Sequence, residues 1–190
     1  MAETTTTSER PPSQTRDQVI IKAKRLEEST FYSCKGHHQA AQGWKTWHLW
    51  LGVPTVIISS LVGVAAFTKT AEQNSYVAAA AVFFSIIVPV LSGITTFLNP
   101  NEKEGTHLAA AHAYDRLNNA TRMFWSIDCW AADATDEGLT SQLKSLVDEK
   151  DNLNKSSPQI PKSAYKKAKK GIQGGEASFQ VDRPTPPPIA

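Results

Sequence analysis

Charged residues are missing from two long stretches of an otherwise polar chain. No Asp, Glu, Lys or Arg occurs in the 23 residues 46–68 or in the 29 residues 73–101. A helix needs roughly 20 apolar residues to cross the hydrocarbon core of a bilayer. The pattern therefore predicts two spans, residues 47–67 and 76–98. The linker between them, residues 68–75, is so short that it predicts an antiparallel helical hairpin.

A soluble bundle with two buried helices is the competing interpretation. A surface helix of a soluble protein carries a polar face, whereas the two predicted spans carry no polar residues beyond Ser, Thr and His48. Aromatic rings favour the headgroup region of a bilayer, and Trp44, Trp47 and Trp50 cluster where the first span begins, while Tyr76 opens the second. We therefore expect an all-α membrane protein, a two-transmembrane helical hairpin with a cytosolic helical bundle.

Basic residues predict the orientation of this hairpin. The linker holds one, Lys69, whereas seven precede the first span and twelve follow the second. By the positive-inside rule, both termini lie in the cytosol and the protein is a multi-pass protein of the cell (inner) membrane. The formal net charge of +2 is too balanced to indicate a nucleic-acid partner.

The polar remainder of the chain predicts four helices and two tails. The tails, residues 1–14 and 173–190, are rich in Thr, Ser or Pro and are expected to be disordered. With the two spans, the predicted helices form one domain, residues 15–172. They cover residues 17–45, 103–130 and 137–154, and a short basic helix covers 162–170.

The predicted helix over residues 103–130 carries a coiled-coil pattern. Small or apolar residues alternate spacings of three and four, which is typical of a helix–helix seam. The partner expected for this seam is the N-terminal helix, whose weaker pattern runs from Ile20 to His37. The seam, which would hold the bundle or an oligomer, consists of Ala110, Ala113, Leu117, Ala120, Phe124 and Ile127.

No residue pattern indicates catalysis, a metal site or a cofactor. His107 and His112 are five residues apart, about 140° around a helix, so they do not share a face. The adjacent His37 and His38 also diverge. Phosphate-binding loops and nucleophile motifs are not recognisable. The two cysteines fit neither a disulfide framework nor a zinc pattern. We therefore expect a protein that is not an enzyme, has no cofactor and keeps both thiols reduced.

Both spans carry stripes of small and hydroxyl residues. Such residues let membrane helices approach closely, or they line a water-filled pore when several copies assemble. The pore-lining or packing candidates are Ser59, Gly63, Ser85, Ser92 and Thr96.

A basic group follows near the C-terminus. Its members form either a solvated helix face or a contact with anionic lipid. They are Lys162, Lys166, Lys167, Lys169 and Lys170.

Three stretches together resemble a known family. They are "WHLWLGVPTVIISSLVGVAAF", "TFLNPNEKEGTHLAAAHAYDRLNNATRMF" and "SSPQIPKSAYKKAKKG". In this order and spacing they are similar to the SLATT family, the SMODS and SLOG-associating two-transmembrane effector domains. The most specific part is the exit from the second span at Asn99-Pro100, followed by an alanine-rich helix.

The resemblance implies a role in prokaryotic conflict. Such effectors are thought to respond to an enzyme that makes a nucleotide second messenger, or to a nucleotide sensor, encoded nearby. They would then oligomerise and permeabilise the membrane of an infected cell. We therefore expect a pore-forming antiviral effector that is a homo-oligomer in membrane lipid. The alternative is a non-conducting membrane scaffold that recruits or regulates a cytosolic partner.

Overall fold

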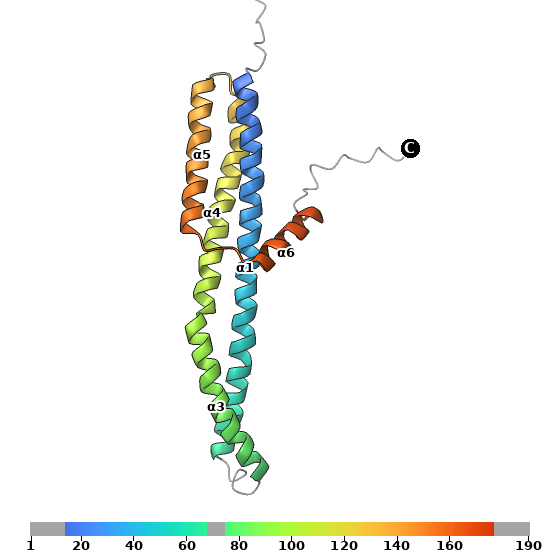
Figure 1. Cartoon of the computed structure of the whole chain (residues 1–190), viewed down its shortest axis with the longest axis vertical. Coiled ribbons are helices and arrows are strands. Elements are labelled where there is room, and N and C mark those ends of the chain that lie inside the picture. The colour runs from blue at the N-terminus through green and yellow to red at the C-terminus, as the bar shows by residue number, and fades with distance from the viewer. Residues whose placement is uncertain (1–13, 68–74, 177–190) are drawn as a thin grey trace, which may run out of the picture.

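The computed structural model describes residues 14–67 and 75–176, and every regular element within them is a helix. The elements form an elongated rod, with an apolar hairpin at one end and a helical bundle at the other (Figure 1). They are α1 (Gln14–Phe67), α3 (Ser75–Leu98), α4 (Pro100–Ser126), the short 3-10 helix η1 (Asp128–Trp130), α5 (Asp136–Ser156) and α6 (Lys162–Gln173).

The backbone of the rod is α1, an unbroken helix of 54 residues. At 1.5 Å per residue it is about 80 Å long. The N-terminal helix, predicted over residues 17–45, therefore continues directly into the first span as one helix. Its first half packs mainly against α4 and its second half against α3. Pro54 lies inside it without ending it, as membrane helices tolerate because neighbouring groups satisfy the freed carbonyl.

A single residue separates α3 from α4. Asn99 has left-handed backbone angles, φ 42° and ψ 60°, a conformation that Asn adopts more readily than most residues. Its side-chain Nδ2 donates to Glu102 Oε2 at 2.5 Å, and Pro100 follows in the first turn of α4, where a missing N–H costs nothing. The second span therefore continues into the bundle with only a local break.

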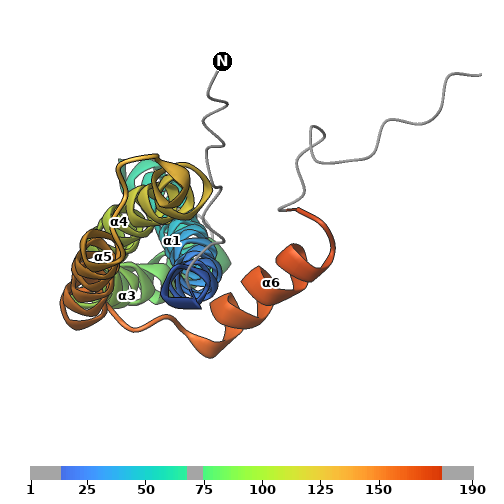
Figure 2. The same cartoon turned by 90° about the horizontal axis from the view of Figure 1, so that it is seen from above.

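Three helices build the bundle, namely the first half of α1, α4 and α5 (Figure 2). Thr135 caps α5 by accepting a hydrogen bond from the Gly138 backbone N–H at 3.2 Å. The core cluster at the end far from the hairpin consists of Val19, Ala23, Leu26, Phe124, Cys129, Leu139 and Leu143.

The last helix, α6, lies outside this bundle and packs on α1 (Figure 2). The segment before it crosses α1 at Gly36. A Cβ at Gly36 would lie 2.9 Å from Cδ1 of Ile160, so glycine is needed here for close approach and not for flexibility. Ala164 and Ala168, one turn apart, are buried where α6 meets α1.

Candidate functional site

The hairpin presents apolar side chains on all sides. None of the residues of α3 is buried, and the most apolar windows of both long helices are 0% buried. A large exposed apolar surface is rare on a soluble monomer. The two helices are long and apolar enough to cross a membrane, and their exposure removes the alternative of a buried soluble core.

Within the hairpin, α1 and α3 meet along a narrow apolar face. Ile58 and Val62 of α1 and Val77, Ala81 and Phe84 of α3 line a cavity of about 230 Å³ between the helices. Their spacing of three and four along each helix is that of a left-handed helix pair. Along this face the described parts of the two spans lie against each other within one chain.

The candidate pore-lining residues lie beside this contact and not in it. Ser59, Ser85, Ser92 and Thr96 are exposed, and Gly63 is half-buried. A Cβ at Gly63 would meet no atom within 4 Å. The stripes therefore remain available to another copy of the chain or to water.

Hydroxyl groups of the spans bond to their own helices. Ser59 Oγ donates to the Thr55 carbonyl at 2.7 Å, Ser85 Oγ to the Val82 carbonyl at 2.7 Å, and Thr96 Oγ1 to the Ser92 carbonyl at 2.9 Å. Such bonds satisfy the hydroxyl within the helix. The side chains are therefore compatible with lipid contact as well as with a lumen.

The seam between α1 and α4 has a different phase from the predicted one. Ala110, Leu117 and Phe124 are buried and Ala113 is half-buried, but Ala120 and Ile127 are exposed. The alternating buried positions of α4 instead include His107, Tyr114 and Thr121. Polar side chains occupy the seam where the pattern favoured alanines, because hydrogen bonds satisfy them.

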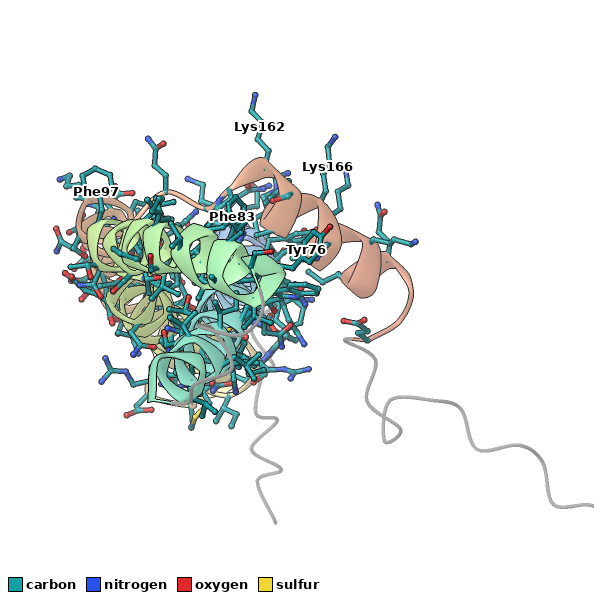
Figure 3. The ribbon with its side chains drawn as sticks, turned by 90° about the horizontal axis from the view of Figure 1, so that it is seen from below. Tyr76, Phe83, Phe97, Lys162 and Lys166 are labelled. Atoms are coloured by element: carbon teal, nitrogen blue, oxygen red, sulfur yellow. The ribbon has the colours of Figure 1, made fainter. Side chains whose placement is uncertain are left out.

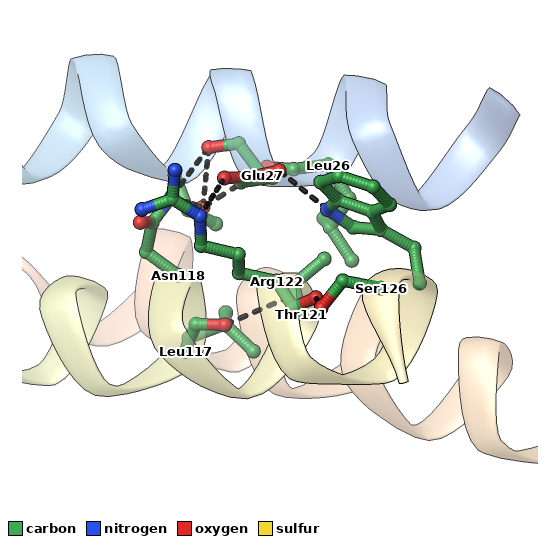
Figure 4. A network of polar contacts seen from close by, with 9 residues as sticks. Leu26, Glu27, Leu117, Asn118, Thr121, Arg122 and Ser126 are labelled. Carbon is green, nitrogen blue, oxygen red and sulfur yellow. Dashed lines mark hydrogen bonds and ion pairs between the residues drawn. The ribbon is translucent and has the colours of Figure 1, made fainter. Parts of the chain in front are cut away.

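A polar network explains this register (Figure 4). Asn118 Nδ2 donates to the Glu27 carbonyl at 2.6 Å and to Thr30 Oγ1 at 3.1 Å. Trp125 Nε1 donates to Glu27 Oε2 at 2.5 Å, and Arg122 Nε lies 3.5 Å from Glu27 Oε1. Buried polar groups are tolerated when they are paired. The network therefore fixes how α1 and α4 align.

A buried histidine pair joins the two helices between this network and the hairpin. Nδ1 of His37 and Nδ1 of His107 are 3.0 Å apart, so one ring donates and the other accepts. The His37 ring stacks on Tyr114, with ring centroids 5.4 Å apart, and the Tyr114 hydroxyl donates to Asn154 Oδ1 at 2.7 Å. His38 and His112 meet beside them, ring edge to face.

Burial lowers the pKa of these imidazoles. The pKa of His37 falls to about 4, because burial disfavours the charged ring and because His107 and His38 add repulsion. Burial also lowers the pKa of His107, helped by Lys103. The pair is therefore neutral near pH 7. The sequence spacing correctly excluded a shared helix face for His107 and His112. It missed that His37 of α1 pairs with His107 of α4, and only their matching positions in the two seams could have indicated that pairing.

Neither a metal site nor a reactive thiol emerges from the described residues. In residues 14–67 and 75–176, no three His, Cys, Asp or Glu side chains are grouped to hold a metal ion. Cys34 and Cys129 are free and buried. Burial raises the pKa of Cys34 to about 11, with Asp115 adding to the shift and Lys35 opposing it, and burial also raises the pKa of Cys129. These thiols are poor nucleophiles at neutral pH.

The lysine group lies on α6, where all five side chains are exposed. Lys162 and Lys166 point away from the other helices (Figure 3). Lys167 instead lines a groove with Trp44 and Trp47 of α1. The group therefore does not act as one surface, since different lysines face different surroundings.

Comparison with known proteins identifies the family. The model of the "SMODS and SLOG-associating 2TM effector domain family 4" matches residues 24–183. No curated protein and no solved structure gives a significant match. The matched region includes both apolar helices, which agrees with a two-transmembrane domain. The chain therefore belongs to the SMODS and SLOG-associating 2TM effector domain family, family 4, and is a membrane protein of the two-transmembrane effector type.

Proposed function

We propose that this chain assembles from several copies and permeabilises the membrane in a nucleotide-signalled antiviral system. One observation supports this most directly, namely that the small and hydroxyl stripes of an effector-family hairpin stay uncovered within one chain. A single hairpin cannot enclose a pore, so copies must supply the remaining wall. The bundle would lie in the cytosol, where an activating enzyme or sensor would act.

Continuity of the helices gives the signal a route. The first half of α1 belongs to the bundle and its second half to the hairpin, while α4 joins α3 across Asn99. A partner or ligand that binds one arrangement of the bundle better would shift a closed–open equilibrium of the hairpin.

Leucine substitutions in the second span test the lumen. We expect Ser85→Leu and Ser92→Leu each to reduce depolarisation of expressing cells by about half or more, because a polar pore wall becomes apolar and narrower. The measurement is a membrane-potential dye after induced expression, normalised to protein in the membrane fraction. Ser60→Leu is the matched control on an exposed position outside the candidate set. Unchanged depolarisation in both α3 variants would refute the stripe as a lumen.

An experiment in liposomes distinguishes the scaffold alternative from the pore. Purified protein that conducts ions or releases a small dye, with or without nucleotide second messengers, supports the pore. Normal oligomers without flux under any of these conditions support a non-conducting scaffold that recruits a cytosolic partner.

A second prediction concerns assembly. Gly63→Leu is expected to lower the oligomer fraction by about half or more, because close helix approach in membranes depends on small residues. The fold of one chain should be unaffected, since no atom lies within 4 Å of the added Cβ. Cross-linking in membranes measures the oligomer, and Gly93→Leu, also in open space on α3, is the control. Equal oligomer in all three proteins would exclude this stripe from the interface.

A further inference from the structure

The helix α6 meets α1 at the level where the first apolar span begins. Between the two helices lies a groove of about 200 Å³. Its α1 side is mainly apolar and aromatic, with Ala40, Gly43, Trp44 and Trp47 beside the polar Gln39. Its α6 side includes Ser163 and Lys167. Trp47 is 59% exposed and stands at the headgroup level if the hairpin crosses the bilayer.

The two edges of α6 face opposite ends of the rod. The Tyr165 ring contacts Tyr32, with ring centroids 6.5 Å apart, and Tyr32 lies three turns of α1 further from the hairpin than Trp44. Lys167 lines the groove with Trp47. Helix spacing places Lys170 on the edge of Lys167, and Lys169 on the edge of Tyr165.

The groove combines the two chemistries of a phospholipid. Tryptophan rings and the backbone at Gly43 offer an apolar wall for an acyl chain, and the ammonium of Lys167 stands beside that wall. α6 carries five lysines and no acidic residue. An anionic headgroup is therefore favoured over a zwitterionic one.

We propose that the groove between α1 and α6 binds an anionic phospholipid. Its phosphate lies at Lys167 and Lys170, and the part of an acyl chain nearest the headgroup lies against Trp44 and Trp47. The proposal rests on the membrane insertion in the proposed function but not on pore formation. A bound lipid clamps α6 to the helix that joins bundle and hairpin, so the local leaflet composition would influence the effector.

Lipid retention tests the site on the full chain in mild detergent. Native mass spectrometry measures how many phosphatidylglycerol and phosphatidylcholine molecules remain bound after the protein is exposed to equal amounts of the two lipids. We expect the wild type to retain more phosphatidylglycerol, and Lys167→Glu to reduce that retention about five-fold or more, because Lys167 lines the groove and the substitution replaces a headgroup-facing positive charge by a negative one. Lys169→Glu makes the same charge change on the opposite edge and should stay within about two-fold.

A groove-filling variant tests the apolar wall. A Cβ at Gly43 meets no atom within 4 Å, so Gly43→Leu fits the helix and should reduce retention of both lipids without loss of fold. Gly105→Leu, in open space on α4, is its control. Glycerol phosphate should not compete at lipid-equivalent concentration, because it lacks the acyl chain.

Three results would overturn the site. They are equal losses in Lys167→Glu and Lys169→Glu, no preference for phosphatidylglycerol in the wild type, and full competition by glycerol phosphate. Failure of the pore proposal is distinguishable, because it appears as absent flux while the lipid preference is retained.

Discussion

Replacing Phe124 with alanine is expected to lower the free energy of unfolding of the bundle by about 3–5 kcal/mol, the usual cost of truncating a buried phenylalanine. Phe124 is 1% exposed and packs in the core cluster with Leu26 and Leu143. Its removal leaves a cavity among three helices that the long, rigid α1 cannot readily close.

Thiol labelling measures this effect in the intact protein. Cys129 is 0% exposed in the same cluster, so a thiol reagent reaches it only when that end of the bundle opens. In a Cys34→Ala background, Phe124→Ala should raise the labelling rate about a hundred-fold or more, since 1.4 kcal/mol is ten-fold in an opening equilibrium.

Ile127 provides the matched control. The sequence pattern placed it in the same seam as Phe124, but its side chain is 59% exposed. Ile127→Ala should therefore change the free energy of unfolding by no more than about 0.5 kcal/mol. Similar labelling rates for the two variants would mean that the bundle core has the register of the original pattern, or that Ile127 is covered in the oligomer.

The hairpin was predictable because charge is a strong signal in membranes. Residues 46–68 and 73–101 contain no charged residue, which indicates two helices that are apolar on all sides. A chain of this size is too small to bury both of them in its own core. The helix predicted over residues 17–45 and the span predicted over 47–67 form the single helix α1, which runs through Lys45–Trp47 without a break. Residues 1–13, 68–74 and 177–190, which hold most of the two expected tails and Lys69, lie outside the described residues.

The seam was harder, because hydrophobic periodicity ignores satisfied polar groups. Ala113 and Tyr114 are adjacent, as are Ala120 and Thr121. A search for hydrophobic periodicity assigns the alanine of each pair to the seam. The structure buries Tyr114 and Thr121 instead, since Asn154 accepts from Tyr114 and the helix accepts from Thr121 at Leu117. A seam of this kind depends on partners from other helices, which one sequence does not reveal.

The contact of α6 with α1 could not be predicted for a similar reason. Gly36 lies inside α1, where a glycine normally weakens a helix. In the folded chain, a Cβ at Gly36 would lie only 2.9 Å from Cδ1 of Ile160, so the glycine permits this close contact. That contact brings the lysines of α6 to the tryptophans of the first span, although about 120 residues separate them in the sequence.

Acidification from pH 7 to pH 5 is expected to destabilise the bundle through the histidine pair. An unfolded histidine has a pKa of 6.5, whereas that of His37 in the fold is about 4. In this window the unfolded state binds more protons, so stability falls as the pH falls. The loss attributable to His37 is about 2 kcal/mol, from 1.36 kcal/mol per pH unit. The lowered pKa values of His38 and His107 act in the same direction.

Other charges around the pair set the size of this effect without reversing it. Burial is the main cause of the lowered pKa of His107, and Lys103 adds to it. Burial, then His112 and Lys35, lower the pKa of His38, while Asp115 opposes that shift. Tyr114 stacks on His37 and stays neutral in this range, because burial raises its pKa.

Thermal unfolding followed by circular dichroism in detergent measures the result. The wild-type Tm should fall by about 5 °C or more between pH 7 and 5, given the usual shift per kcal/mol. His37→Gln keeps a hydrogen-bonding side chain but does not titrate, so its Tm should depend much less on pH. A pH-dependent loss confined to the wild type would assign the effect to protonation of His37. Equal pH dependence in the two proteins would place the titrating groups elsewhere.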